Sequence, residues 1–457
     1  MTGVMTSLHT LSATTLSGMM ARGDVSVVEV TDAFLARIAA HNDALQAFVH
    51  VAAFRARRRA RALDAARRRG DFPLSPLAGV PMGIKDLYPV RLMPMRGGSR
   101  ALGPIITPFD AVNVARLRAA GVVMLGKLAT SEFGAMPFTE PDVHAPTRNP
   151  WDLSTTSGGS SGGTAAATAA GLVPLGHGSD GGGSIRIPAA LCGLFGFKAG
   201  RGALVHNSPT ERLHLATEGP LAHTVDDATA MLQLLATDAR FARPAVVPTG
   251  LRVRIAVDSS EPALAPTAPV MAQAALHVAS LLQGLGHHVD ETGPVPLGLP
   301  QFLPLWQRTL AWVPVPSMLE HRLQPITRWL RQAGKDISEA TAFSTLDQIT
   351  AVVDGWWGDA DLFVSPAVTC LPPAVGSWRR DDPAEAFNQA VPLAVFTAAF
   401  NASGQPAMTI PVRLPGMSQP VGVQVVARRG DDALLLAVAR VLEGALGGLS
   451  HRPPAFR

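Results

Sequence analysis

The 457-residue sequence predicts an α/β fold in which a central, twisted, mixed β-sheet is sandwiched by α-helices. Segments with helical periodicity alternate with short apolar segments, an order typical of parallel or mixed sheets covered by helices. The composition, 47% hydrophobic and 16% charged, is that of a globular protein with a large buried core. Because no internal repeat and no linker-like segment interrupts the pattern, we expect a single domain over residues 1–457.

Residues 1–70 are expected to form N-terminal helices. Ser26 and Glu29 have the spacing of a capping box, in which two side chains bind the first free backbone N–H groups of a helix. Apolar residues then recur every fourth position from Val30 to Ile38, which predicts one buried helical face.

Eight arginines fall between Arg55 and Arg69, interleaved with alanines and Leu63. This pattern is typical of the solvated face of an alanine-rich helix. An RNA-binding or membrane-binding patch is the alternative, but aromatic stacking residues are missing and the net charge of the chain is only +4. We therefore expect neither a nucleic acid nor a membrane as partner.

The cysteines and histidines indicate an intracellular protein without a metal. Cys192 and Cys370 are too few for a disulfide framework in a chain of this length. Residues 1–20 lack the basic and apolar regions of a signal peptide, which favours a cytoplasmic location. The thirteen histidines show no paired ligand spacing, so we expect no metal and no cofactor.

Residues 71–240 form the predicted core. Residues 77–87 (LAGVPMGIKDL) should be a turn that leads into a buried strand carrying Lys85. A helix at Asp110–Ala120 and a strand at Val122–Gly126 continue the alternation.

The most informative stretch is Ser157–Gly193, where two glycine-flanked serines are separated by a small-residue segment. We expect a helix at Thr164–Ala170, a strand at Leu172–Leu175 and a tight glycine-rich turn over Gly176–Ser184. Consecutive backbone N–H groups in such a turn can form an anion-binding nest that stabilises a developing oxyanion. The candidate oxyanion donors are the N–H groups of four consecutive residues: Gly181, Gly182, Gly183 and Ser184.

Two other motifs match this stretch. Gly176, Gly178 and Gly181 form a GxGxxG pattern typical of dinucleotide-binding folds, but no acidic residue follows at the expected distance and Pro188 should interrupt the helix.

The second motif is the GxSxG pattern around Ser160, which matches the nucleophile elbow of α/β-hydrolases. That hypothesis requires a late histidine. His451 is the only histidine after His321, and it lies in a proline-rich tail.

Lys85 is the candidate base that would activate a serine without a histidine. It lies in an apolar segment, where a lysine is costly unless it is used or paired. Desolvation can lower a lysine pKa from ~10.4 toward ~7 or 8, which leaves a neutral amine able to accept a proton.

These segments resemble the amidase signature family. Lys85 lies in a GVPxxIKD segment, Ser160 is the first serine of GGSSGG, and Ser184 is the serine of GGSIR, 24 positions later (184 − 160). Further similarity extends over nearly the whole chain, through NPW at 149–151, FNxxGQPA at 400–407 and PVGVQ at 420–424. The resemblance implies the amidase-signature fold, with residues 71–240 as its signature core.

The resemblance also implies a Ser-cisSer-Lys triad of Lys85, Ser160 and Ser184, with a cis peptide between Gly159 and Ser160. Ser184 would be the nucleophile that forms an acyl-enzyme. Four neighbouring residues are expected to support the site through hydrogen bonds and charge: Ser161, Ser179, Asp180 and Arg186.

The version HGSDGGGSIRIPA is similar to bacterial amidases that hydrolyse aminohexanoate cyclic dimers, aryl acylamides and carbamates. It therefore implies a small-molecule amide or carbamate (urethane) substrate. Esterase or urethanase activity is a candidate side activity, and a homodimer is the candidate assembly. Two alternatives stay open: the glutaminase-type subunit of a tRNA amidotransferase, and a catalytically silent subunit with the same fold.

Residues 241–457 should complete the sheet and the substrate pocket. A strand at Val421–Val426 and a helix at Asp432–Leu442 are predicted near the end. Residues 297–349 are rich in Pro, Leu and Trp, and we expect them to be the least regular part of the chain. Three tryptophans in that part are candidates for the pocket wall, with the hydrophobic core as their alternative location: Trp306, Trp312 and Trp329.

Overall fold

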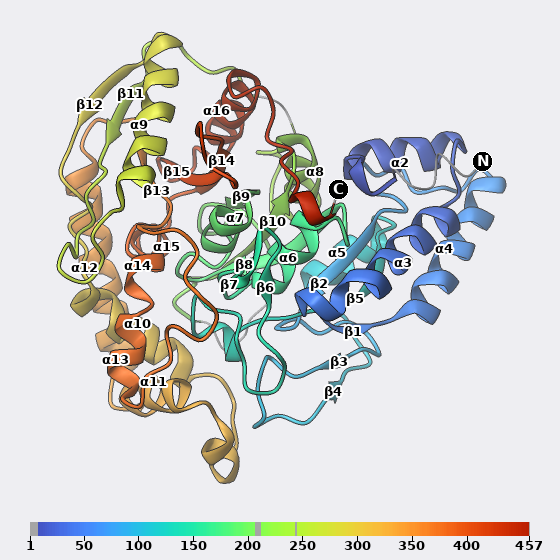
Figure 1. Cartoon of the computed structure of the whole chain (residues 1–457), viewed down its shortest axis with the longest axis horizontal. Helices are drawn as coiled ribbons and strands as arrows, with labels where there is room; N and C mark the ends of the chain where they lie inside the picture. Colours follow the sequence, from blue (N-terminus) through green and yellow to red (C-terminus); the bar gives the residue numbers. More distant parts are fainter. Residues whose placement is uncertain (1–7, 206–211, 243–244, 457) are drawn as a thin grey trace.

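The computed structural model describes residues 8–205, 212–242 and 245–456. Within these residues, eleven strands form one mixed sheet (Figure 1). Across the sheet their order is β1 (Phe48–Val51), β5 (Val123–Leu128), β2 (Pro81–Lys85), β8 (Leu175–Asp180), β10 (Thr217–Ala222), β9 (Phe195–Lys198), β14 (Ala407–Val412), β15 (Val421–Ala427), β13 (Leu362–Pro366), β11 (Arg252–Ile255) and β12 (His288–Glu291). The neighbours β5–β2, β2–β8, β13–β11 and β11–β12 are parallel and the other pairs are antiparallel, which confirms the predicted mixed sheet.

Helices cover both faces of this sheet. Every residue of β2, β5, β8, β13, β14 and β15 is buried, which a strand achieves only when both faces are covered. The edge strands β1 and β12 carry exposed residues. The helices are α2 (Ala13–Arg22), α3 (Val27–Leu45), α4 (Ala53–Arg68), α5 (Val112–Ala119), α6 (Gly162–Ala169), α7 (Arg186–Cys192), α8 (Val225–Leu235), α9 (Pro269–Gly284), α10 (Leu299–Ala311), α11 (Pro325–Lys335), α12 (Glu339–Trp357), α13 (Pro383–Asn388), α14 (Val391–Ala394), α15 (Ala399–Ala402) and α16 (Asp432–Ala445).

Two small hairpins and four short 3-10 helices complete the described elements. The hairpins pair β3 (Pro94–Met95) with β4 (Ile105–Ile106), and β6 (Arg148–Asn149) with β7 (Asp152–Thr156). The 3-10 helices are Leu8–Thr10, Glu132–Gly134, Ser317–Arg322 and Pro454–Phe456. Strands from all three predicted regions join the large sheet, so a single domain stays our prediction.

The N-terminal helices follow the local sequence signals. The Glu29 N–H donates to Ser26 Oγ at 3.0 Å, and the Ser26 N–H donates to Glu29 Oε2 at 2.8 Å. This is the predicted capping box, and it starts α3. The arginine-rich segment forms α4, as predicted.

The prediction of a strand at Leu172–Leu175 followed by a turn is wrong. β8 begins where that strand was expected to end, and it includes Gly176 and Gly178. A Cβ on Gly178 would lie 2.7 Å from Leu221 Cδ1, and one on Gly176 would collide with side chains of α6. Close packing therefore explains these glycines, and only residues 181–184 form the turn before α7.

Proline misled the sequence analysis at two places. Residues 297–349 are not irregular, because α10, α11 and part of α12 lie there. Pro300 and Pro325 occupy the first two positions of α10 and α11, where the missing N–H has no helical partner in any case. Pro188 likewise lies in the first turn of α7 and does not interrupt it. In the part of the chain that the structure describes, every helix is too short or too polar to cross a bilayer.

Candidate active site

The parallel pairing of β2 with β8 brings two predicted site residues together. Lys85 is the last residue of β2, and Ser179 lies one residue before the end of β8. Ile84 is in register with His177. Because neighbouring parallel strands end at the same edge of a sheet, Lys85 and Ser179 lie side by side.

The GGSSGG segment brings two more hydroxyl groups to Lys85 from the N-terminal end of α6. The peptide that joins Gly159 to Ser160 is cis, as the resemblance implied. Lys85 Nζ is hydrogen-bonded to Ser160 Oγ at 2.7 Å and to Ser161 Oγ at 2.8 Å. It also contacts Ser179 Oγ at 3.0 Å and the Ser179 carbonyl oxygen at 3.2 Å. One amine thus has polar contacts with three serines.

The amine of Lys85 is held in a dry environment. The side chain is fully buried. Burial lowers its pKa to about 7, although the Asp180 and Glu218 carboxylates offset part of this effect. The surroundings therefore disfavour the ammonium form by about 5 kcal/mol relative to water. A large fraction of this lysine is a neutral base at neutral pH.

Ser184 lies in the loop between β8 and α7, and Asp180 fixes that loop. The Asp180 carboxylate accepts hydrogen bonds from the N–H groups of Gly183 at 2.7 Å and Ile185 at 3.2 Å. The Ser161 N–H donates to the Ser184 carbonyl oxygen at 3.3 Å, which connects the loop to the GGSSGG segment. Of the four predicted oxyanion donors, the N–H of Gly183 is already bonded to Asp180.

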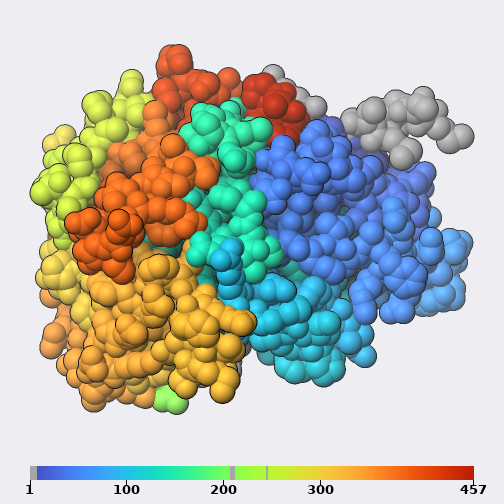
Figure 2. Space-filling view, turned by 60° about the horizontal axis from the view of Figure 1, so that its bottom comes forward, coloured from blue at the N-terminus to red at the C-terminus, as the bar shows by residue number. Residues whose placement is uncertain are grey.

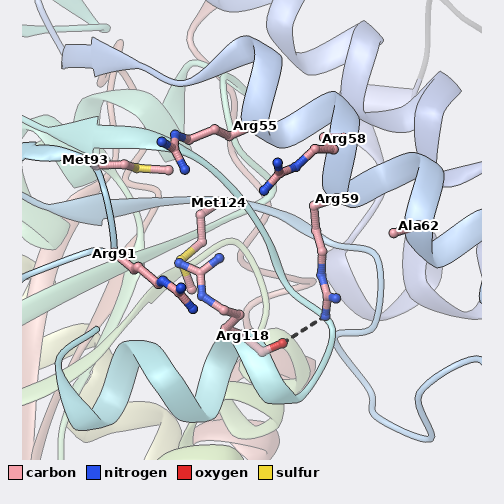
Figure 3. Close-up of a pocket in the computed structure, with 8 residues that line it drawn as sticks. All are labelled: Arg55, Arg58, Arg59, Ala62, Arg91, Met93, Arg118 and Met124. Carbon is pink, nitrogen blue, oxygen red and sulfur yellow. Dashed lines mark hydrogen bonds between the residues drawn. The ribbon is translucent and has the colours of Figure 1, made fainter. Parts of the chain in front are cut away.

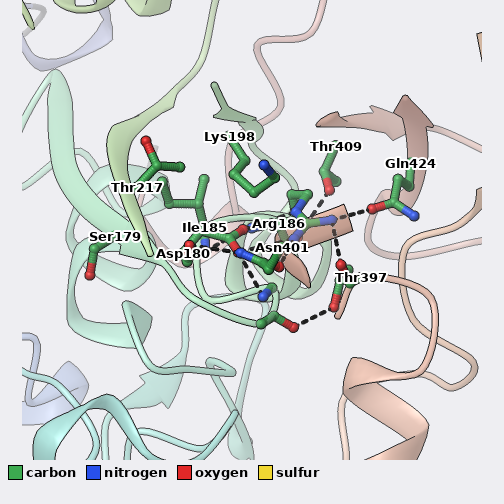
Figure 4. A network of polar contacts seen from close by, with 12 residues as sticks. Ser179, Asp180, Ile185, Arg186, Lys198, Thr217, Thr397, Asn401, Thr409 and Gln424 are labelled. Atoms are coloured by element: carbon green, nitrogen blue, oxygen red, sulfur yellow. Dashed lines mark hydrogen bonds and ion pairs between the residues drawn. The ribbon is translucent and has the colours of Figure 1, made fainter. Parts of the chain in front are cut away.

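Asp180 and Arg186 form an ion pair at the centre of a buried network (Figure 4). Both side chains are fully buried, and the Arg186 Nε and Nη2 atoms lie 2.9 and 3.0 Å from the two carboxylate oxygens. Burial alone would raise the pKa of the Asp180 carboxyl, but the Arg186 charge and hydrogen bonds hold it well below its usual range. Removing one partner from such a pair costs about 3–5 kcal/mol. The loop that carries Ser184 therefore rests on a rigid support.

Three residues of this network were missed as site residues by the sequence analysis. Arg186 Nη1 donates to Gln424 Oε1 at 2.6 Å and to the Thr397 carbonyl oxygen at 3.0 Å, and Asn401 Nδ2 donates to Asp180 Oδ1 at 2.9 Å. Thr397 Oγ1 also donates to the Gly182 carbonyl oxygen at 2.7 Å. Asn401 and Gln424 lie in the FNxxGQPA and PVGVQ segments, so the signal was present, but no role was assigned to it.

Ser160, Ser179, Gly181 and Ser184 line one cavity of about 360 Å³. Its other walls come from residues 87–105, which include β3, from residues 133–134 and 215–216, and from α10 with the residues just after it. Figure 2 views the face where the gold residues of α10 and α11 meet the blue part of the chain. None of the described residues that line this cavity carries a charged side chain: Leu87, Tyr88, Met95, Gly97, Leu102, Ile105, Phe133, Gly134, Ser160, Ser179, Gly181, Ser184, Leu215, Ala216, Trp306, Thr309, Leu310, Val313 and Pro314.

One of the three candidate tryptophans lines this cavity. Trp306 stacks on Phe302 with ring centroids 6.0 Å apart, and its indole N–H donates to the Ala135 carbonyl oxygen at 3.0 Å. Trp312 lies under the Arg308 guanidinium instead, and Trp329 packs against a phenylalanine. Trp306 is therefore fixed as a flat apolar wall beside the serines.

Comparison with known proteins agrees with this geometry. The sequence model of a family described as "Amidase" matches residues 29–436, which is most of the chain. The chain belongs to the amidase signature family. A 6-aminohexanoate-cyclic-dimer hydrolase of Paenarthrobacter ureafaciens is 33% identical to it, over 96% of each chain. A solved structure of 6-aminohexanoate cyclic dimer hydrolase complexed with substrate has a TM-score of 0.87 and 28% identity, and it covers 98% of this chain and 100% of that one. A glutamyl-tRNA(Gln) amidotransferase chain from Salinispora arenicola is 34% identical, over 99% of this chain and 100% of its own length.

The two alternative motif interpretations, a nucleophile elbow at Ser160 and a dinucleotide-binding turn, do not fit the structure of this amidase-family hydrolase. The elbow hypothesis needs a histidine at Ser160, but Ser160 Oγ is hydrogen-bonded to Lys85. The dinucleotide hypothesis needs a glycine turn after a strand, but Gly176 and Gly178 lie inside β8.

One histidine of this amidase lies on β8, close to the site. His177 is fully buried, its Nε2 lies 2.8 Å from Asn113 Nδ2, and burial lowers its pKa to about 3. Among the described residues, no group of three or more His, Cys, Asp or Glu side chains is arranged to hold a metal ion.

Proposed function

We propose that this amidase hydrolyses uncharged, largely apolar carboxamides by transferring their acyl group to Ser184. The observation that carries the proposal is the 2.7 Å contact between the buried Lys85 amine and Ser160 Oγ, at the wall of the cavity that also contains Ser184. A neutral lysine beside a hydroxyl is a general base, and a second serine in the same cavity can be the nucleophile.

The hydrogen-bond pattern favours Ser160 as the proton donor to Lys85. Ser161 Oγ donates its hydrogen to the Ser179 carbonyl oxygen at 3.1 Å, so it can only accept a hydrogen bond from Lys85. A neutral amine has two N–H groups, which are used by Ser161 and Ser179. Its lone pair is then directed at the hydroxyl of Ser160.

The proposed reaction follows from this arrangement. Lys85 accepts the proton of Ser160, and the Ser160 oxygen accepts the proton of Ser184 while Ser184 Oγ attacks the amide carbon. The N–H groups of Gly181, Gly182 and Ser184 stabilise the oxyanion, since the N–H of Gly183 is used by Asp180. The C–N bond then breaks, and the leaving amine takes its proton back through Ser160. Water hydrolyses the acyl-enzyme by the same proton route and frees Ser184.

The cavity favours neutral substrates over glutamine. An amino acid bears an ammonium and a carboxylate group, and burying either one without a partner is costly. The described cavity wall has no charged side chain to pair with them, and Trp306 and Phe133 offer apolar contacts. This favours a cyclic or aromatic amide over the glutamine that a glutaminase would bind. Carbamates and esters share the reacting carbonyl and are the comparison substrates for the proposal.

A fluorophosphonate probe tests the proposed nucleophile. We expect one covalent adduct on Ser184, located by mass spectrometry of the digested protein, because only an activated serine reacts with this probe. Pre-incubation with p-nitroacetanilide, a neutral anilide, should slow the labelling. An adduct on Ser160 would support the elbow hypothesis, and complete absence of labelling would support the hypothesis of a catalytically silent protein with this fold.

The pH dependence of hydrolysis tests the base. The pKa of Lys85 is lowered to about 7, and only the neutral amine accepts a proton. Below this pKa the lysine is protonated and inactive, so kcat/KM should rise with pH, reach half its maximum near pH 7 and then level off. Steady-state rates with one anilide from about pH 5 to about pH 9 measure this curve. A flat profile over that range would contradict Lys85 as the base.

A further inference from the structure

Five arginines from three segments meet at a second cavity, which shares no lining residue with the serine cavity (Figure 3). Its volume is about 290 Å³, and Met93 and Met124 also line it. Arg55, Arg58 and Arg59 extend from α4, Arg91 lies in the loop before β3, and Arg118 is on α5. We call this site the arginine cavity.

The arrangement is more than the solvated helix face that the sequence suggested. Residues 55, 58, 59 and 62 of α4 share one helical face, and this face is turned toward Arg118 on α5. Arg59 Nη2 donates to the Arg118 carbonyl oxygen at 3.0 Å. In contrast, Arg61 and Arg68 of the same helix do not line the cavity. Three separate segments therefore place positive charges around one hollow.

The protein offsets only part of the positive charge in the arginine cavity, through the Asp110 carboxylate, whose charge acts on Arg118 and on Arg91. Asp110 forms an ion pair with Arg118, at 2.6 Å from Nε and 2.9 Å from Nη2. Among the described residues, no ion pair engages the guanidinium groups of Arg55, Arg58 or Arg91, and the buried Nε of Arg59 has no hydrogen-bond partner.

The position of Arg59 adds to the excess of positive charge in the arginine cavity. Burial and the charge of Arg118 both lower the pKa of Arg59. A multivalent anion would remove the repulsion between these groups and supply acceptors for their free N–H donors.

We propose that the arginine cavity binds a compact anion with at least two phosphate-type groups, such as inorganic diphosphate or the diphosphate part of a phosphorylated metabolite. Guanidinium groups match the oxygens of phosphates through paired hydrogen bonds, and several face one hollow here. A cavity of about 290 Å³ fits a compact group. Nucleic acid needs an extended basic stripe with stacking aromatics, whereas two methionines line this hollow.

Isothermal titration calorimetry of the full-length protein with inorganic diphosphate, at constant ionic strength, tests this proposal. We expect saturable binding of one diphosphate per chain. The double variant Arg55→Gln/Arg91→Gln should weaken binding at least about tenfold, because it removes two guanidinium groups from the cavity. Neither guanidinium has an ion-pair partner in the described structure, so both substitutions should leave the fold intact. Thermal unfolding of the variant measures whether it does.

A matched control removes the same charge elsewhere. Arg61→Gln/Arg68→Gln takes two arginines of α4 that do not line the cavity and should bind diphosphate with the affinity of the parent protein. Equal weakening in both double variants would show that net charge alone attracts the anion, and would overturn the proposal. Absence of diphosphate binding would also overturn the proposal. So would binding that depends on Arg55 and Arg91 for phosphatidylglycerol vesicles but not for diphosphate. The Ser184→Ala variant should bind diphosphate normally, which separates this site from the proposed catalytic function.

Discussion

Replacing Ser184 by alanine is expected to lower kcat for anilide hydrolysis by at least about 10⁴-fold. Without the Ser184 hydroxyl no acyl-enzyme can form, and the proton route through Ser160 has no group to activate. The loss should appear in kcat and in kcat/KM together, because the side chain removed is small and the apolar walls of the cavity remain. Steady-state kinetics with p-nitroacetanilide measure both constants, and circular dichroism checks that the variant is folded.

Ser157→Ala is a matched control for this prediction. Ser157 is also a buried serine beside the GGSSGG motif, but its hydroxyl donates to the Thr147 carbonyl oxygen at 3.2 Å and does not contact Lys85. This variant should keep most of its activity. If Ser184→Ala retained activity within about tenfold of the parent, Ser184 could not be the nucleophile.

Replacing Lys85 by methionine is expected to lower kcat by about 10²- to 10⁴-fold, the usual contribution of a positioned general base. Methionine has a similar length and no charge, so the substitution removes the base without leaving a buried unpaired ion. The residual rate should also lose its pH dependence near pH 7, because the deprotonation of the Lys85 amine causes that dependence. If the variant lost rate but its rate still rose with pH near pH 7, another group would be responsible for that pH dependence.

Lys198 provides a closely matched control for Lys85. It is buried on β9, and burial lowers its pKa to about 7 as well. Its Nζ donates a hydrogen bond to the Ala199 carbonyl oxygen, its charge acts on Asp180 and Arg186, and the residue lines a different cavity. Lys198→Met should therefore keep most of the activity and the full pH profile. An equal loss of rate in the two variants would indicate a general effect of removing a buried amine.

The sequence predicted the parts of the site that depend on residue type and local spacing. A lysine in an apolar segment is costly, so an unusual buried environment of Lys85 could be predicted before its partners were known. The serines of GGSSGG and GGSIR were identified by motif, and Ser26 with Glu29 identified the start of α3. These signals are local, which is why they could be recognised in the sequence alone.

Features that depend on distant neighbours could not be predicted. Glycine has a low strand propensity, and close contacts with Thr164, Thr168 and Leu221 explain why β8 contains Gly176 and Gly178. Pro300 and Pro325 suggested irregular structure because proline breaks a helix interior but is tolerated at its start.

The support of the loop that carries Ser184 could not be predicted for the same reason. Gln424 is separated from Arg186 by 238 positions, so neither residue indicates the other in the sequence. The arginine cavity has the same character, because Arg55 and Arg118 meet only in the folded chain.

The hydrogen-bond acceptors of Arg186 lie far from it in the sequence, and this has a consequence for the newly synthesised protein. Arg186 lies before the middle of the chain, but Thr397 and Gln424 leave the ribosome near the end of synthesis. Until then the buried guanidinium lacks two of its acceptors, and the loop that carries Ser184 has no firm base. We therefore expect chains that end before Gln424 to lack this support for the loop that carries Ser184.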